Sequence, residues 1–175
     1  GHYNAFDEDI ENLLQYSKNK GYTTLLNVAC PSGSWSSNAE VMCDEKDTAH
    51  IIQLRKKYKN VFRNLWNPLD KQFEDVLGCN TVNRMYITPL GDVLVCPYVH
   101  IKIGNIYEQS LEEIKDYGFS INRFRDYSSL CLAGEDKEFN KKYMQFEGQS
   151  IFKPVLASDI FKGDDFMKDK REIST

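Results

Sequence analysis

The sequence contains no long hydrophobic run. No window approaches the roughly 20 apolar residues that a membrane-spanning helix needs, and the first residues lack the charged and apolar regions of a signal peptide. We therefore expect a cytoplasmic protein that has no membrane partner.

Concentrated positive charge is also missing. The net charge is −4, and basic runs such as Arg55–Lys57 are short. A protein that binds nucleic acid through its phosphates needs a concentrated basic face, so we expect no nucleic-acid partner. Hydrophobic residues make up 41% of the chain and charged residues 27%, as in ordinary globular domains, and 175 residues can bury a sizeable core.

Cysteine pairs are absent. The five cysteines are an odd number, they lie far apart, and no C-x-x-C pair occurs. Widely spaced cysteines in a chain with no secretory signal argue against a disulfide framework, and the lack of C-x-x-C knuckles argues against a zinc ribbon. Buried thiols, a nucleophile or metal ligands remain as explanations.

The first 70 residues alternate helices and strands. We expect a helix from a cap at Asp7 to Gly21, and then a buried strand at Thr23–Ala29. A polar loop, a helix that Asp44 caps and that runs to Tyr58, and a strand at Val61–Leu65 complete the pattern. This order is typical of a parallel α/β layer. Because no strand precedes the first helix, a piece of a larger barrel is favoured over a small free-standing α/β domain.

After Pro68 the pattern changes to a hairpin and short helices. Two β-prone runs, Met85–Thr88 and Val93–Cys96, flank the turn Pro89–Asp92. Ser110 and Glu113 form a capping box. We also expect helices at Ser110–Tyr117, Ser120–Tyr127 and Glu135–Gln145. The remaining residues should form an irregular tail that docks into a groove through Ile151, Phe152, Ile160 and Phe161. Beyond Asp169 the chain should be loose.

Three cysteines accompany this second half. The hairpin folds Cys96 back toward Cys79, and Cys131 follows two helices that can pack on the hairpin. Soft thiolates favour zinc or an iron–sulfur cluster over hard cations. On spacing alone, three buried apolar cysteines are slightly favoured over a metal site.

The residues around these cysteines resemble a known family of domains. The stretch that begins at Cys79 and continues through Tyr86–Tyr98 resembles the SPASM and twitch domains, the C-terminal accessory domains of radical S-adenosylmethionine enzymes. In those domains a cysteine, a variable gap, a glycine, four residues and a second cysteine begin an auxiliary cluster site. The likeness extends through Gly104–Ile106 and the helix after Ser110 to Cys131, and residues 1–29 and 41–58 more weakly resemble part of the enzymes' barrel.

The resemblance implies a fold and a function. The chain would be α/β: the C-terminal part of a partial (β/α)6 barrel in residues 1–70, a small α+β twitch/SPASM-like domain in residues 71–146, and a tail in residues 147–175. Cys79, Cys96 and Cys131 would bind an auxiliary [4Fe-4S] cluster for electron transfer or substrate anchoring. Asn27 would point into the barrel, in the substrate or nucleoside pocket. The alternative is a zinc-filled structural or interaction module.

The resemblance also implies what this chain lacks. The C-x3-C-x2-C motif that binds the radical-generating cluster does not occur. S-adenosylmethionine and a second [4Fe-4S] cluster would therefore belong to the full-length enzyme, an oxidoreductase or a modifying enzyme. Its partners would be a peptide or small-molecule substrate and a reductant such as flavodoxin or ferredoxin.

The fourth ligand of the cluster is open to several interpretations. Twitch domains often place a fourth cysteine three residues after the third, where this chain has Gly134. His100, Glu135 and Asp136 are near enough in sequence to replace it. A histidine beside Tyr98 is more often a packing residue, and the two acidic residues suit a helix cap, so we expect an open iron. The polar loop between Cys30 and Cys43 is either part of the active site or a surface loop with two incidental thiols.

Overall fold

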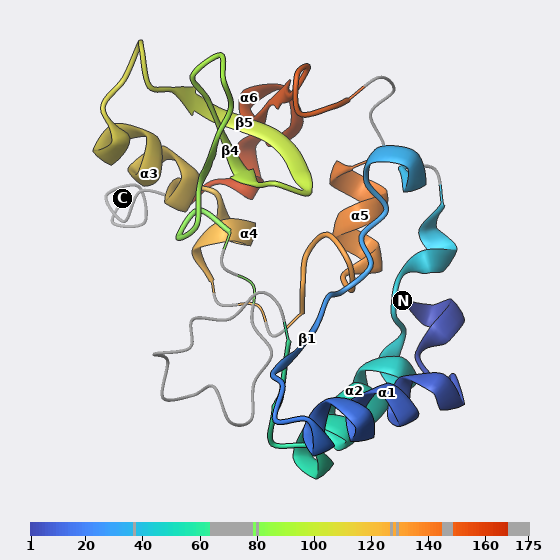
Figure 1. Cartoon of the computed structure of the whole chain (residues 1–175). Helices are drawn as coiled ribbons and strands as arrows, with labels where there is room; N and C mark the ends of the chain where they lie inside the picture. The colour runs from blue at the N-terminus through green and yellow to red at the C-terminus, as the bar shows by residue number, and fades with distance from the viewer. Residues whose placement is uncertain are drawn as a thin grey trace, which may run out of the picture. The chain divides into compact units, whose positions relative to one another are not determined.

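The computed structural model describes residues 1–36, 38–63, 79, 81–126, 128, 130–144 and 149–167. The chain divides into two compact units (Figure 1). The first unit consists of Gly1–Cys79 together with Ser129–Lys141, and the second of Asn80–Ser128 together with Lys142–Thr175. The predicted domain boundaries near residues 70 and 146 lie outside the described residues, so they stay predictions.

The first unit contains the predicted β–α–β order. Helix α1 (Glu8–Asn19) begins at Asp7, which accepts a hydrogen bond from the backbone of Asp9. Strand β1 (Thr24–Leu26) precedes two short 3-10 helices, and then come helix α2 (Glu45–Lys57) and strand β2 (Val61–Arg63). Asp44 and Asp47 form the capping box of α2. Strands β1 and β2 pair in parallel, so both helix starts and the parallel layer are confirmed.

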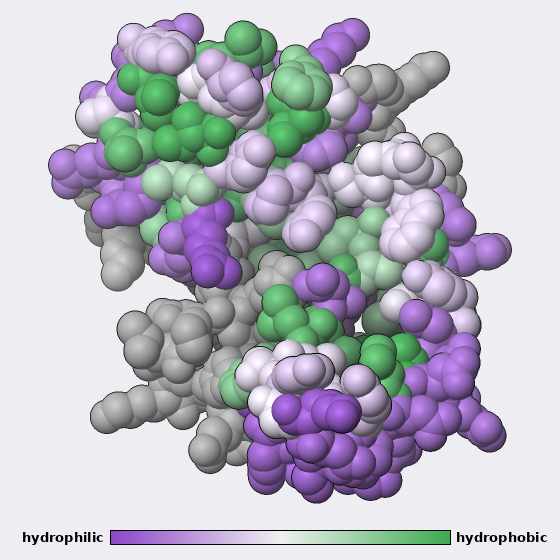
Figure 2. Space-filling model, viewed as in Figure 1, coloured by the Kyte–Doolittle hydropathy of each residue, from purple (hydrophilic) through white to green (hydrophobic). Residues whose placement is uncertain are grey.

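A small core holds this layer together. Leu14 of α1 packs with Leu54, Tyr58 and Val61, and Ile10 and Leu26 pack against this cluster. The Tyr58 hydroxyl also donates a hydrogen bond to Glu11 across the two helices, at 2.8 Å. The outer faces of α1 and α2 carry exposed charged side chains and give a mostly hydrophilic surface (Figure 2, purple). Among the described residues this unit has a two-stranded sheet, and no barrel is present.

The second unit is built on a four-stranded sheet. Its order is β3 (Tyr86–Ile87), β4 (Asp92–Cys96), β5 (Val99–Asn105) and β6 (Val155–Leu156). The first three strands are antiparallel, and β6 runs parallel to β5. The predicted hairpin is thus confirmed. The prediction missed β5, although its buried Val99, Ile101 and Ile103 alternate with less buried neighbours.

Short helices accompany the sheet. Helix α3 (Leu111–Ser120) begins at the predicted capping box of Ser110 and Glu113, and α4 (Asn122–Arg125) is shorter than predicted. Helix α5 (Lys137–Tyr143) buries Phe139 and Tyr143, as predicted. No described helix has the length and apolar character that crossing a membrane requires.

The C-terminal segment is more regular than predicted. Residues 149–167 contain strand β6, helix α6 (Ala157–Ile160) and a 3-10 helix at Gly163–Asp165. Phe161 is buried, and its ring lies against Phe124 and Tyr143, so its predicted docking is confirmed. Phe152 is 71% exposed, so its predicted docking is wrong. The segment beyond Asp169 lies outside the described residues.

Candidate metal centre

The hairpin that carries Cys96 turns on a glycine. The Thr88 carbonyl accepts a hydrogen bond from Gly91 at 3.0 Å, and the Thr88 N–H donates to the Asp92 carbonyl at 2.9 Å. This pattern is a three-residue loop in which a turn is followed by a glycine bulge. Gly91 has φ +81°, a backbone conformation that favours glycine, and the turn starts at Thr88, one residue before the predicted Pro89. Strand β4 then ends at the partly exposed Cys96.

Asn105 fastens the turn to β5. Its side-chain amide donates hydrogen bonds to the Leu90 carbonyl at 3.1 Å and to the Asp92 carboxylate at 2.9 Å, and its amide oxygen accepts one from the Tyr107 N–H at 2.9 Å. Lys102 forms a 2.5 Å ion pair with Asp92. Burial alone would raise the pKa of Asp92, but hydrogen bonds from Lys102 and Asn105 outweigh burial and hold the pKa below its ordinary value.

Val82 lies between Cys79 and the hairpin and has an unusual backbone conformation. Its φ is +65°, in a region that β-branched residues rarely adopt, and its side chain is buried. The Val82 N–H donates to the carbonyl of Val95 at 3.2 Å. Val95 directly precedes Cys96, so this hydrogen bond ties the chain after Cys79 to the end of β4.

Cys131 begins a tight turn in the first unit. Its carbonyl accepts hydrogen bonds from the N–H groups of Gly134, Glu135 and Asp136, at 3.2, 2.8 and 3.1 Å. The Cys131 N–H in turn donates to the Glu135 carboxylate at 2.8 Å. The other oxygen of Glu135 accepts a hydrogen bond from the Thr48 hydroxyl at 2.9 Å, which connects the turn to α2. Cys131 itself is 4% exposed.

The candidates for the fourth ligand have other roles in the structure. Asp136 accepts a hydrogen bond from the Phe139 N–H at 2.8 Å, so its predicted capping of the last helix is confirmed. Glu135 instead binds the backbone of Cys131 and the hydroxyl of Thr48, which the sequence did not predict. His100 is half-buried in β5. Burial lowers the pKa of its imidazole, although a hydrogen bond to the backbone of Pro97 opposes this shift.

The three predicted cluster ligands belong to different compact units. Cys79 and Cys131 lie in the first unit, and Cys96 lies in the second. Cys79 and Cys96 are partly exposed. The convergence of the three sulfurs therefore stays a prediction. Asn27 is exposed, directly after β1, and its place in a nucleoside or substrate pocket also stays a prediction.

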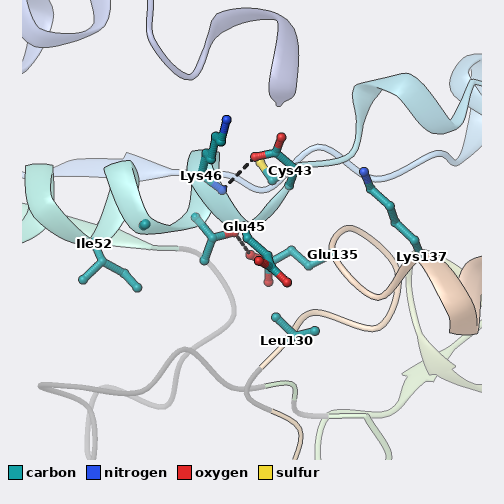
Figure 3. Close-up of a pocket in the computed structure, with 10 residues that line it drawn as sticks. Cys43, Glu45, Lys46, Ile52, Leu130, Glu135 and Lys137 are labelled. Carbon is teal, nitrogen blue, oxygen red and sulfur yellow. Dashed lines mark hydrogen bonds between the residues drawn. The ribbon is translucent and has the colours of Figure 1, made fainter.

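A cavity of about 670 Å³ lies beside the Cys131 turn, within the first unit. Its lining comes from α2 and the residues just before it, including Cys43, Lys46 and Ile52, and from the segment that contains Leu130 and Glu135 (Figure 3). Apolar side chains and charged groups of both signs meet there. Such a mixed lining suits a small polar molecule or a peptide side chain.

Sequence reasoning missed a histidine–carboxylate contact. In the structure, His2 Nδ1 lies 2.7 Å from Asp47 Oδ2, and Asp44 is close to both. The partners are 45 residues apart, so no spacing could reveal the contact. The two carboxylates already accept backbone hydrogen bonds at the positive end of α2, which disfavours a cation there. This cluster is explained as a helix cap.

Comparison with known proteins identifies one segment of the chain. Residues 79–142 match the family model of SPASM, an iron-sulfur cluster-binding domain. The matched segment begins at Cys79 and contains Cys96 and Cys131. No curated protein and no solved structure matches the chain. Residues 79–142 are therefore a SPASM iron–sulfur domain, of the type found in the C-terminal auxiliary part of radical S-adenosylmethionine enzymes, as the sequence predicted.

Proposed function

We propose that this chain is the C-terminal part of a radical S-adenosylmethionine enzyme and that Cys79, Cys96 and Cys131 hold its auxiliary [4Fe-4S] cluster. The observation that carries the proposal is the SPASM match, which begins at Cys79 and includes the other two cysteines. Thiolates are the ligands that such clusters use in proteins, so the donor set fits the cofactor.

Chain connectivity supports the pairing of Cys79 with Cys96. Cys79 is three residues from Val82, and three residues of extended chain span at most about 11 Å. Because Val82 is hydrogen-bonded to Val95, chain length limits how far Cys79 can lie from the end of β4. The glycine turn and the hydrogen bonds of the Asn105 side chain keep β4 in register with β3. Cys96, at the end of β4, therefore has a defined position.

The first unit supports the barrel part of the proposal. Its strands β1 and β2 are parallel and are connected through α2, which is the repeating unit of a (β/α) barrel. Asn27 follows the carboxyl end of β1, the edge where such barrels bind their ligands. We infer that these residues are the end of a partial (β/α)6 barrel and that Asn27 contributes to its nucleoside or substrate pocket.

The cluster would supply an electron relay, or an iron that anchors the substrate, in an oxidoreductase or a peptide- or small-molecule-modifying enzyme. The residues of this chain would shield it from water and fix the positions of its thiolates. S-adenosylmethionine and a second [4Fe-4S] cluster would bind to a part of the enzyme outside this chain. A peptide or small molecule would be the substrate, and flavodoxin or ferredoxin would be the reductant.

Anaerobic reconstitution tests this proposal. We expect the chain to become brown, with broad visible absorption and with iron and acid-labile sulfide in equal amounts. Cys131→Ala should bind less of both than the parent, whereas Cys43→Ala, which removes another buried thiol of the same unit, should keep the parent's content. A colourless protein that binds zinc and takes up no sulfide would instead identify a structural zinc module.

A further inference from the structure

Gly134 occupies the position at which many twitch domains have the fourth cysteine. In this structure, that position has no room for a larger side chain unless its neighbours shift. A Cβ atom on Gly134 would lie 2.6 Å from Val28 Cγ1 and 2.8 Å from the Ala29 carbonyl oxygen. The Ala29 oxygen is backbone, so it can give way only if the whole segment that carries it is displaced. The chain that leaves β1 therefore occupies the space that a cysteine at position 134 would need.

The same chain segment brings a sulfur to this place. The Cβ of a residue at 134 would lie 3.1 Å from Cys30 Sγ. A side chain at 134 would thus point toward the thiol that Cys30 already presents. Gly134 and Cys131 are held in one tight turn by the hydrogen bond from the Gly134 N–H to the Cys131 carbonyl. All of these residues belong to the first unit.

The surroundings of Cys30 suit a cluster ligand. Cys30 is 8% exposed, and both Ala29, which precedes it, and Ala133, which precedes Gly134, are also buried. Its thiol makes a sulfur–oxygen contact of 3.6 Å with the Val28 carbonyl. Because S–H is a weak donor, giving up that contact on deprotonation costs little. A thiol that ligates iron releases its proton to solvent, and the resulting thiolate needs no other base once the metal is bound.

We propose that Cys30 supplies the fourth thiolate of the auxiliary cluster, in place of the cysteine that Gly134 replaces. The inference rests on the proposed function and replaces the open iron that the sequence led us to expect. All four irons of the cluster would then be ligated by protein. Such a cluster serves as an electron relay and cannot anchor a substrate directly through a vacant iron.

The test compares variants of the whole chain after identical anaerobic reconstitution. Iron and sulfide are measured per chain, and electron paramagnetic resonance spectra are recorded after mild oxidation. A [4Fe-4S] cluster with one iron lacking a protein thiolate loses that iron on oxidation and gives a three-iron signal. We expect the parent and Cys43→Ala to resist this conversion and Cys30→Ala to undergo it.

Gly134→Ala provides an independent variant, because alanine coordinates nothing. Its methyl group should push the segment 28–30 away, so it should reproduce the three-iron signal of Cys30→Ala. Circular dichroism of the iron-free variants identifies any that fail to fold. If Cys30→Ala folds and keeps the iron content and spectra of the parent while Cys131→Ala loses its cluster, the assignment of Cys30 is wrong and the proposed function stands. A parent that binds no cluster would refute the proposed function itself.

Discussion

Replacing Gly91 by valine should damage the metal centre as much as the loss of a ligand, although glycine coordinates nothing. A non-glycine residue at φ +81° costs about 1–2 kcal/mol, and a β-branched one costs more. The new Cβ would lie 2.5 Å from the Tyr107 ring and 2.9 Å from Asn105 Oδ1. Tyr107 is 77% exposed and can move, but Asn105 is buried.

The buried contact sets the size of the effect. Displacing Asn105 would break hydrogen bonds to Leu90, Asp92 and Tyr107, each of which contributes about 1 kcal/mol net. Together with the backbone strain, we expect a loss of roughly 3–5 kcal/mol in the free energy of unfolding. The relief of this strain opens the turn and moves β4, so Cys96 loses its position.

Denaturant unfolding and the iron and sulfide content after reconstitution measure the two effects. The matched control is Gly163→Val, because Gly163 also has a positive φ, +42°, but no atom lies within 4 Å of the Cβ position. This control should be destabilised only by the backbone strain, and it should keep its cluster. Asp92→Ala is a poor control because its carboxylate binds Lys102 and Asn105. Unchanged stability and iron content in Gly91→Val would refute the role of the turn.

Other outcomes follow from the same contacts. Thr48→Val leaves a buried oxygen of Glu135 without its hydroxyl donor and should destabilise the chain by about 1–3 kcal/mol in denaturant unfolding; an unchanged midpoint would contradict this. The pKa of Asp92 is lowered on folding, so its stabilisation is present above the ordinary carboxyl pKa of 3.8 and is lost as the pH falls through the lowered value; Asp92→Asn should flatten this acid limb of the stability profile. Ser110→Ala removes the cap of α3 and should cost about 1 kcal/mol, seen as a lower thermal midpoint. The isolated chain should form no 5′-deoxyadenosine from S-adenosylmethionine, and chromatographic detection of that product would show that the reading of the missing motif is wrong.

Local signals in the sequence predicted the elements that are locally determined. The starts of three helices follow from side chains that cap backbone groups two or three residues away, as at Asp7, Asp44 and Ser110. Gly91 belongs to the same class, because its positive φ is a property of one short turn. Strand β5 was also readable from its alternating residues, so its omission was an error of interpretation.

The features that were missed depend on contacts between distant residues. Strand β6 has two residues, and it exists because Val155 pairs with Ile101. No local pattern marks such a short strand. Glu135 was expected to cap the following helix, but it accepts a hydrogen bond from Thr48, a residue 87 positions earlier. The proximity of Cys30 to Gly134 likewise depends on tertiary packing.

The 87-residue span between Thr48 and Glu135 has a consequence for the order of assembly. Closing a loop of that length costs about 4 kcal/mol of chain entropy, according to the logarithmic dependence on loop length. We therefore expect the Cys131 turn to dock after α2 has formed, because the contacts with the folded helix offset this cost. During synthesis, the segment that carries β1, α2 and β2 is made before Cys131, so this layer can form before the turn docks. Cluster insertion should then be the last step of maturation, and slowing it should leave a nearly folded, metal-free chain that is still able to accept iron.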